Sequence, residues 1–154
     1  MRAFQSLVIL ASAAALACQK PAAVAGNWAD SLTNGRSHLL RLEKAGNFEA
    51  HFVGSVDGHI DDGQYALATG EGKTYIVRTY EALAGGKRVP RVDTLRATMN
   101  ADGDVLHIEG TEFGTSAAPL AMKRISDEAM VALAAKARKT ILESVAMKIG
   151  MQFR

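Results

Sequence analysis

The sequence has little of what stabilises small exported domains or carries a chain through a membrane. Cys18 is the only cysteine among 154 residues, so no disulfide within the chain can support the fold. The longest apolar run lies between Leu7 and Ala17 and is shorter than the roughly 20 residues that a membrane-spanning helix needs. One tryptophan, three tyrosines, five phenylalanines and a formal net charge of +2 supply no basic, aromatic-rich surface, which argues against nucleic acid as a partner.

Motifs of common catalytic sites are also missing. The chain has no G-x-S-x-G, no H-E-x-x-H and no P-loop sequence. Histidine and carboxylate side chains can together hold a divalent metal, and five of them lie close in sequence: His51, Asp57, His59, Asp61 and Asp62. Their spacing matches no known metal loop, and we interpret the segment 54–63 as a solvated acidic turn. We therefore expect no enzyme, metal or cofactor, unless a concave site brings His51, His59 and Asp61 together.

The chain begins with a short leader that ends at Cys18. Arg2 precedes the apolar run, which begins with Leu7-Val8-Ile9-Leu10 and continues into three alanines at positions 13–15, and this is typical of a secretory signal peptide. Leu16-Ala17-Cys18 resembles the lipobox of bacterial lipoproteins, whose cysteine forms a thioether to diacylglycerol. The resemblance implies a signal peptide over residues 1–17, acyl chains such as palmitate on Cys18 and a lipidated tether over residues 18–25. An ordinary secretory peptide followed by an unmodified cysteine is the alternative.

The residue after the cysteine bears on where such a lipoprotein resides. Aspartate at that place retains enterobacterial lipoproteins in the inner membrane, and this chain has Gln19 instead. By resemblance, we expect an outer-membrane lipoprotein that faces the periplasm.

Residues 26–125 alternate apolar and polar side chains between glycine-containing turns. Alternating stretches of this kind predict short antiparallel strands, and we expect them at residues 37–43, 48–53, 64–69, 74–80, 92–99, 105–109 and 120–125, with a possible short strand at Glu112-Phe113. Seven or eight strands without a crossover helix favour a mainly β fold, an antiparallel up-and-down barrel or a curled meander. A two-sheet sandwich would need longer connections, which only 54–63 and 82–90 could provide.

Gly26-Asn27-Trp28 matches the G-x-W element of lipocalins, in which the tryptophan packs under the closed end of the barrel. The chain thus resembles small bacterial lipocalin-like lipoproteins over residues 26–125. In that arrangement Arg124 on the closing strand could lie over the indole of Trp28, a cation–π contact of roughly 0.5–2 kcal/mol. We expect an inward, apolar set that could line a ligand pocket or simply fill the barrel: Leu40, Leu42, Phe48, Phe52, Tyr65, Leu67, Tyr75 and Leu95. Tyr75 is ambiguous because its strand has two possible inward faces.

A C-terminal α-helix over residues 126–150 completes the expected fold. Ser126 is placed as its N-cap, and Gly150 as its C-cap. Met130, Leu133, Ala134, Ala137 and Ile141 share one helix face, and Leu142, Val145 and Ile149 broaden it, which predicts packing on the outside of the barrel. The four basic residues among 136–148 keep a second interpretation open, in which the helix contacts a membrane or a partner.

Together these patterns predict a non-enzymatic binding module for a small apolar ligand or an envelope protein. The alternative is a periplasmic inhibitor or immunity protein that acts on an enzyme through a loop at 54–63 or 82–90. A structural role that links envelope components through the C-terminal helix is a third possibility.

Overall fold

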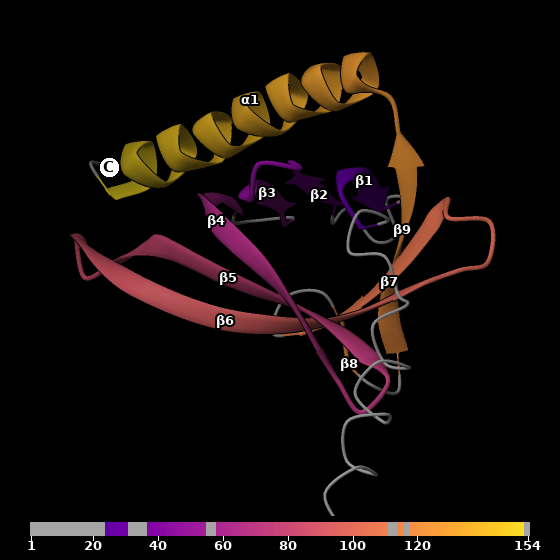
Figure 1. The fold of residues 1–154 in the computed structure, drawn as a ribbon. Coiled ribbons are helices and arrows are strands. Elements are labelled where there is room, and N and C mark those ends of the chain that lie inside the picture. The colour runs from indigo at the N-terminus through magenta and orange to yellow at the C-terminus, as the bar shows by residue number, and fades with distance from the viewer. Residues whose placement is uncertain (1–23, 31–36, 55–57, 111–113, 116–117, 153–154) are drawn as a thin grey trace, which may run out of the picture.

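The described part of the chain is a closed antiparallel β-barrel with one long helix on its outside (Figure 1). The computed structural model describes residues 24–30, 37–54, 58–110, 114–115 and 118–152. The expected signal peptide, Cys18 and most of the tether lie outside the described residues, as does the strand expected at Glu112-Phe113.

Eight strands close the barrel in the order β1-β2-β3-β4-β5-β6-β7-β9, and β9 returns to pair with β1. A ninth described strand, β8, pairs only with β9. Their bounds are β1 (Gly26–Asp30), β2 (Ser37–Leu42), β3 (Asn47–Val53), β4 (Gly58–Gly70), β5 (Lys73–Ala84), β6 (Lys87–Met99), β7 (Val105–Glu109), β8 (Gly114–Thr115) and β9 (Ala118–Ile125). The predicted mainly β, antiparallel barrel with a C-terminal helix is confirmed.

The register of the strands decides which side chains face the barrel interior, because residues directly opposite in an antiparallel pair share a face. Trp28 lies opposite Leu40, Leu42 opposite Phe48, and Ile76 opposite Leu95. The core is built from these alternate positions, and its fully buried members are Trp28, Leu40, Leu42, Ile76, Leu95, Leu106, Ile108 and Met122. They fill the half of the barrel at which the chain enters β1, which we name the closed half.

Trp28 and Arg124 seal the end of the closed half. The indole is fully buried, and its Nε1 donates a 3.0 Å hydrogen bond to the carbonyl oxygen of Val24. The guanidinium carbon of Arg124 lies 4.2 Å from the centroid of the indole, which confirms the predicted cation–π contact. A Cβ atom on Gly26 would collide with Nη1 of Arg124, and Gly26 has a φ of +150°. Glycine is therefore required at this position by both space and backbone conformation.

The helix α1 (Asp127–Gln152) packs against the outside of β1 to β4 (Figure 1). The backbone N–H of Ala129 donates a 3.2 Å hydrogen bond to Oγ of Ser126, so the predicted N-cap is confirmed. Met130, Ala134 and Ala137 are buried against a small second core, formed with Leu39 and by partly buried Ala29, Val53 and Ile125. The predicted C-cap is wrong, because the helix continues through Gly150, where glycine costs only about 1 kcal/mol relative to alanine.

Two segments expected as loops are instead strand. β4 begins at Gly58, so half of the expected acidic turn pairs with β3, with Phe52 opposite His59 and Ala50 opposite Asp61. The expected connection at 82–90 is a tight turn at Gly85-Gly86 between the long strands β5 and β6. Local sequence suggested turns in both places, but pairing between strands that are neighbours along the chain overrides that preference.

Candidate functional site

Most of the eight predicted pocket residues belong to the packed core. Leu40, Leu42, Phe48 and Leu95 are at most 3% exposed and pack together in the closed half. Tyr65 and Leu67 are partly buried and pack against the same core. These six side chains contact one another and their core neighbours, so they fill the closed half as a packed core would.

Two of the eight residues lie elsewhere. Tyr75 faces Ala68 and Arg96 in the register, while its neighbours Thr74 and Ile76 pair on the inner face. The expectation that Tyr75 points inward is therefore wrong, and its ring lies on the outer face of the barrel. Phe52 does face inward, but it lies opposite His38 and His59, beyond the apolar core.

The half of the barrel beyond the core, which we name the mouth half, is lined by charged and polar side chains. Arg78 on β5 is 1% exposed and lies opposite Asp93 on β6. Its Nε donates a 2.8 Å hydrogen bond to Oδ1 of Asp93, and Nη2 of Arg78 contacts Oδ2 of the same carboxylate. The guanidinium carbon also lies 5.2 Å from the Phe48 ring centroid and 5.3 Å from that of Tyr80, so aromatic faces cover the buried cation.

Tyr80 completes this cluster from the same strand. Its hydroxyl group donates a 3.3 Å hydrogen bond to Oδ2 of Asp93. Burial, and next the negative charge of Asp93, raise the pKa of Tyr80 to about 12, so the phenol remains protonated over the physiological range. The cluster thus presents a fixed guanidinium, a carboxylate and a neutral hydroxyl group at the top of the core.

Two histidine–aspartate pairs flank Phe52 in the mouth half. Nδ1 of His38 lies 3.4 Å from Oδ2 of Asp30, and Nε2 of His59 lies 3.5 Å from Oδ2 of Asp61. The Phe52 ring centroid lies 5.0 Å from that of His38 and 5.3 Å from that of His59. Asp61 is 8% exposed, so the expected solvated acidic turn is wrong for this residue. The register of β3 and β4 turns its side chain into the barrel.

His51 does not converge with His59 and Asp61. It faces the outside of the barrel, opposite Leu39, and α1 covers it so that only 2% remains exposed. Its Nε2 is bonded to Oε1 of Glu49, which also accepts a 2.5 Å hydrogen bond from Nη2 of Arg138 on α1. Within the described ranges, no group of three or more histidine, cysteine, aspartate and glutamate residues is arranged to hold a metal ion.

The Glu49 carboxylate joins β3 to α1 through its contact with Arg138. The contribution of this carboxylate to the stability of the folded protein should depend on pH. Burial by itself raises the pKa of Glu49, but the hydrogen bond from His51 and the charges of His51, Arg138 and Arg41 outweigh it and hold the pKa below 4.5. A carboxylate whose pKa is lowered by folding stabilises the folded protein at pH values above its unfolded-state pKa. This stabilisation is lost as the pH falls through the folded-state pKa.

We therefore expect Glu49→Gln to lower the free energy of unfolding at neutral pH. The difference from the parent protein should shrink as the pH falls from the unfolded-state pKa of about 4.3 through the lower folded-state pKa, below which the carboxylate is neutral in both states. Urea unfolding curves at a series of pH values measure this difference. Glu81→Gln, on an exposed strand position, is the matched control and should give no comparable trend. A Glu49→Gln deficit that stays constant down to pH 2 would contradict the assignment.

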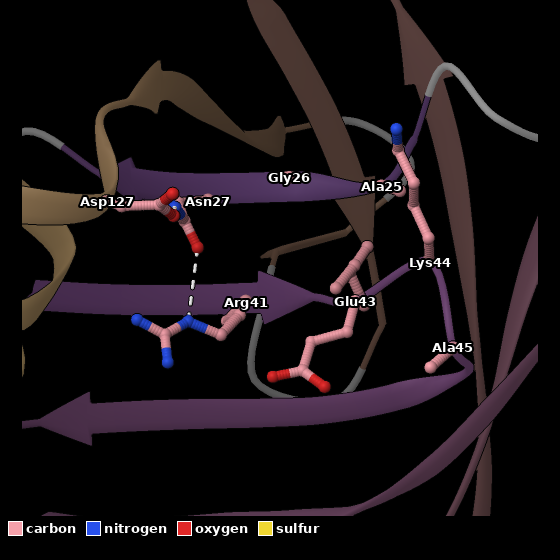
Figure 2. A pocket seen from close by; sticks show the side chains of 9 residues that line it. Ala25, Gly26, Asn27, Arg41, Glu43, Lys44, Ala45 and Asp127 are labelled. Atoms are coloured by element: carbon pink, nitrogen blue, oxygen red, sulfur yellow. Dashed lines mark hydrogen bonds between the residues drawn. The ribbon is translucent and has the colours of Figure 1, made fainter.

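A pocket of about 630 Å³ opens on the outer surface where the chain enters β1 (Figure 2). Nε of Arg41 donates a 3.2 Å hydrogen bond to Oδ1 of Asn27, and Nδ2 of Asn27 donates one of 2.6 Å to Oδ1 of Asp127. Lys44 and Glu43 line the turn beside them. Two bases and two acids therefore line the pocket, so it offers no net charge to attract an ion.

The β5–β6 hairpin, residues 81–92, extends beyond its neighbouring strands. The pairing of β4 with β5 ends at Tyr80, and the pairing of β6 with β7 begins at Arg96. Leu83 and Val92 are 77% and 68% exposed on the hairpin, although both are large and apolar. Three of its charged residues are basic, Lys87, Arg88 and Arg91, and one is acidic, Glu81.

The edge of this hairpin is poorly suited to adding another strand. Pro90 has no backbone N–H to donate, and lysine and arginine side chains along an edge discourage strand pairing. A partner that uses the hairpin would therefore recognise its side chains, which are apolar and basic.

No family model matches the chain, and no match is found among curated proteins or among solved structures. None of the described helices is both long enough and apolar enough to span a membrane.

Sequence reasoning missed the residues that distinguish the mouth half. Arg78 and Asp93 lie within stretches expected as strands or their flanks, but neither was a candidate. The signal was the alternation of Ile76, Arg78 and Tyr80 on one face, which places a charge in line with core positions. A charged residue at such a position points to a buried partner on the neighbouring strand.

Proposed function

We propose that this protein is a lipid-anchored, non-enzymatic binding module of the bacterial envelope, and that its partner is a protein. In this proposal Cys18 carries the acyl chains, and the barrel is a lipocalin-like domain in the periplasm, held at the outer membrane. The cation–π contact of Arg124 with Trp28 supports the likeness to lipocalins, because the G-x-W tryptophan of that family lies at the closed end of the barrel. The barrel by itself supports the fold and does not define a function.

The β5–β6 hairpin is the observation that carries the choice of a protein partner. It holds Leu83 and Val92 exposed on the same face of a projecting element, where one partner surface can contact both side chains and the neighbouring Arg88. A small apolar ligand is less well supported, because the six core residues expected to line its pocket pack against one another. If the partner is an enzyme, the module is an inhibitor or immunity protein and the hairpin is its reactive element.

A double variant on the hairpin tests this proposal. We expect Leu83→Asp with Val92→Asp to abolish the bound partner while leaving the fold intact, because substitutions at such exposed sites usually change stability by less than about 0.5 kcal/mol. Native mass spectrometry of the protein, extracted from its bacterial envelope in mild detergent, measures the complex. The matched control is Leu142→Asp, at an equally exposed apolar site on α1, and it should retain the partner.

Each outcome of that experiment decides between the candidate functions. A mass that equals the protein plus a second polypeptide, lost only in the hairpin variant, supports the proposal. A bound mass of a few hundred daltons that survives the hairpin changes would replace it with small-ligand binding. The mass of the acylated chain alone, after gentle extraction, would contradict a stable partner.

A further inference from the structure

The helix α1 carries two apolar faces, and the barrel covers only one of them. Met130, Ala134 and Ala137 face the barrel and are buried, with Ile141 continuing the same line. A Cβ atom on Gly58 would come within 2.7 Å of Cγ1 of Ile141, so glycine on β4 lets the helix approach closely. The prediction of a broader packed face is wrong for Leu133, Leu142, Val145 and Ile149, which are 38%, 69%, 45% and 51% exposed.

The second apolar face points away from the barrel. Successive residues of an α-helix are rotated by about 100°, which places one set of side chains between roughly 100° and 200° from the barrel-facing line. This outward face consists of Val131, Ala132, Ala135, Lys139, Leu142, Ala146, Ile149 and Gly150, all of them exposed. Val131, Leu142 and Ile149 are 62%, 69% and 51% exposed. Glu128, in the first turn of the helix, lies on the same side, so this face carries one acid, Glu128, and one base, Lys139.

A helix that served only to cover a barrel would carry polar residues on this side. Instead the outward face runs from residue 131 to 149, about 27 Å at a rise of 1.5 Å per residue. Between residues 136 and 148 the helix carries four bases, Lys136, Arg138, Lys139 and Lys148, and one acid, Glu143. Lys136 and Arg138 border the outward face and Lys139 lies on it, while Lys148 falls on the barrel-facing line. Arg138 also pairs with Glu49 on the barrel, and Lys139 pairs with Glu143. Helices that lie on anionic membranes likewise carry lysine and arginine beside an apolar face.

The tether brings a membrane close to this helix. Cys18 lies six residues before Val24, and a fully extended chain covers at most about 3.6 Å per residue, so acyl chains on Cys18 lie within about 22 Å of Val24. The chain then enters β1, where Asn27 donates a 2.6 Å hydrogen bond to Asp127, the first residue of α1. The chain thus enters the barrel beside the start of the helix, and the length of the tether limits how far the anchor point lies from it.

We propose that α1 lies along the membrane surface, with its outward face against the headgroups of anionic phospholipids. This inference rests on the lipid anchor of the proposed function. β5 and β6 belong to the part of the barrel wall that follows the strands on which α1 packs (Figure 1). The anchored helix and the partner-binding hairpin are then separate elements of one small domain.

The test uses the single cysteine of the chain. In the acylated protein Cys18 is blocked, so a cysteine introduced by Ala146→Cys can be labelled alone with an environment-sensitive fluorophore. The protein is reconstituted into vesicles of phosphatidylethanolamine and phosphatidylglycerol. We expect a blue shift of the label at 146 and its quenching by spin-labelled lipid. The same label introduced by Leu83→Cys on the hairpin is the control and should show neither effect.

A second pair of variants separates the outward face from the anchor. Leu142→Asp with Ile149→Asp should abolish the blue shift at 146, because two charged groups then face the headgroup layer. Leu83→Asp with Val92→Asp, which changes equally exposed side chains on the hairpin, should leave the shift unchanged. An equal shift in pure phosphatidylcholine vesicles would overturn the role of anionic lipid.

The remaining outcomes distinguish this inference from the proposed function. If intact mass shows an acylated Cys18 but the label at 146 stays in water, the helix inference fails and the anchor stands. If Cys18 carries no acyl chain but added vesicles still shift the label, the anchor fails and the helix contact stands. A shift that appears without vesicles, together with a dimer mass, would assign the outward face to a second copy of the chain and overturn the inference.

Discussion

Replacing Trp28 with alanine is expected to lower the free energy of unfolding by about 3–5 kcal/mol. The indole is fully buried, it packs into the core of the closed half, and its Nε1 is bonded to the carbonyl oxygen of Val24. The substitution leaves a cavity and removes the surface over which Arg124 lies. Because a domain of this size has a total stability of only about 5–15 kcal/mol, urea unfolding followed by circular dichroism should show a much lower midpoint.

Two further variants separate the contributions at this closed end. Arg124→Met removes the cation–π contact and the hydrogen bonds to the carbonyl oxygens of Gly103 and Ala25, so a smaller loss is expected. Val92→Ala, on the exposed hairpin, should change the free energy of unfolding by less than about 0.5 kcal/mol. A loss below about 1 kcal/mol for Trp28→Ala would contradict its place in the core.

The features that sequence predicted correctly are those encoded by local pattern. Alternating side chains between glycine turns were enough to predict an antiparallel barrel. A strand with one buried face has an apolar residue at every second position. Ser126 predicted the start of α1 because an N-cap acts within three residues. Trp28 and Arg124 are nearly a hundred residues apart, and their contact was predicted only through the resemblance to lipocalins.

The features that sequence missed depend on the register in which neighbouring strands pair. The segment 54–63 contains two glycines after its first residue and three aspartates, which is typical of a turn, yet β3 recruits its second half into β4. Tyr75 lies in a strand of β-branched and aromatic residues that gives no face preference, so only its register with Ala68 and Arg96 shows that it points outward. The register is also what brings Arg78 opposite Asp93.

Replacing Arg78 with alanine is expected to cost about 3–5 kcal/mol of unfolding free energy, as large an effect as the loss of Trp28. Arg78 is 1% exposed, so its removal leaves the Asp93 carboxylate without its bidentate partner and uncovers the faces of Phe48 and Tyr80. Urea unfolding measures the loss, and Arg88→Ala, an exposed arginine on the hairpin, is the control.

The double variant Arg78→Met with Asp93→Leu tests what the buried pair is for. A buried ion pair replaced by apolar side chains of similar volume is often neutral for stability or better, while a broken pair is strongly destabilising. We expect the double variant to recover most of the stability that Arg78→Ala loses. Recovery would mean that the barrel can fold with an apolar mouth half, so the charges in that half contribute specificity at the open end of the domain. A loss as large as in the single variant would instead make the pair part of the structural core.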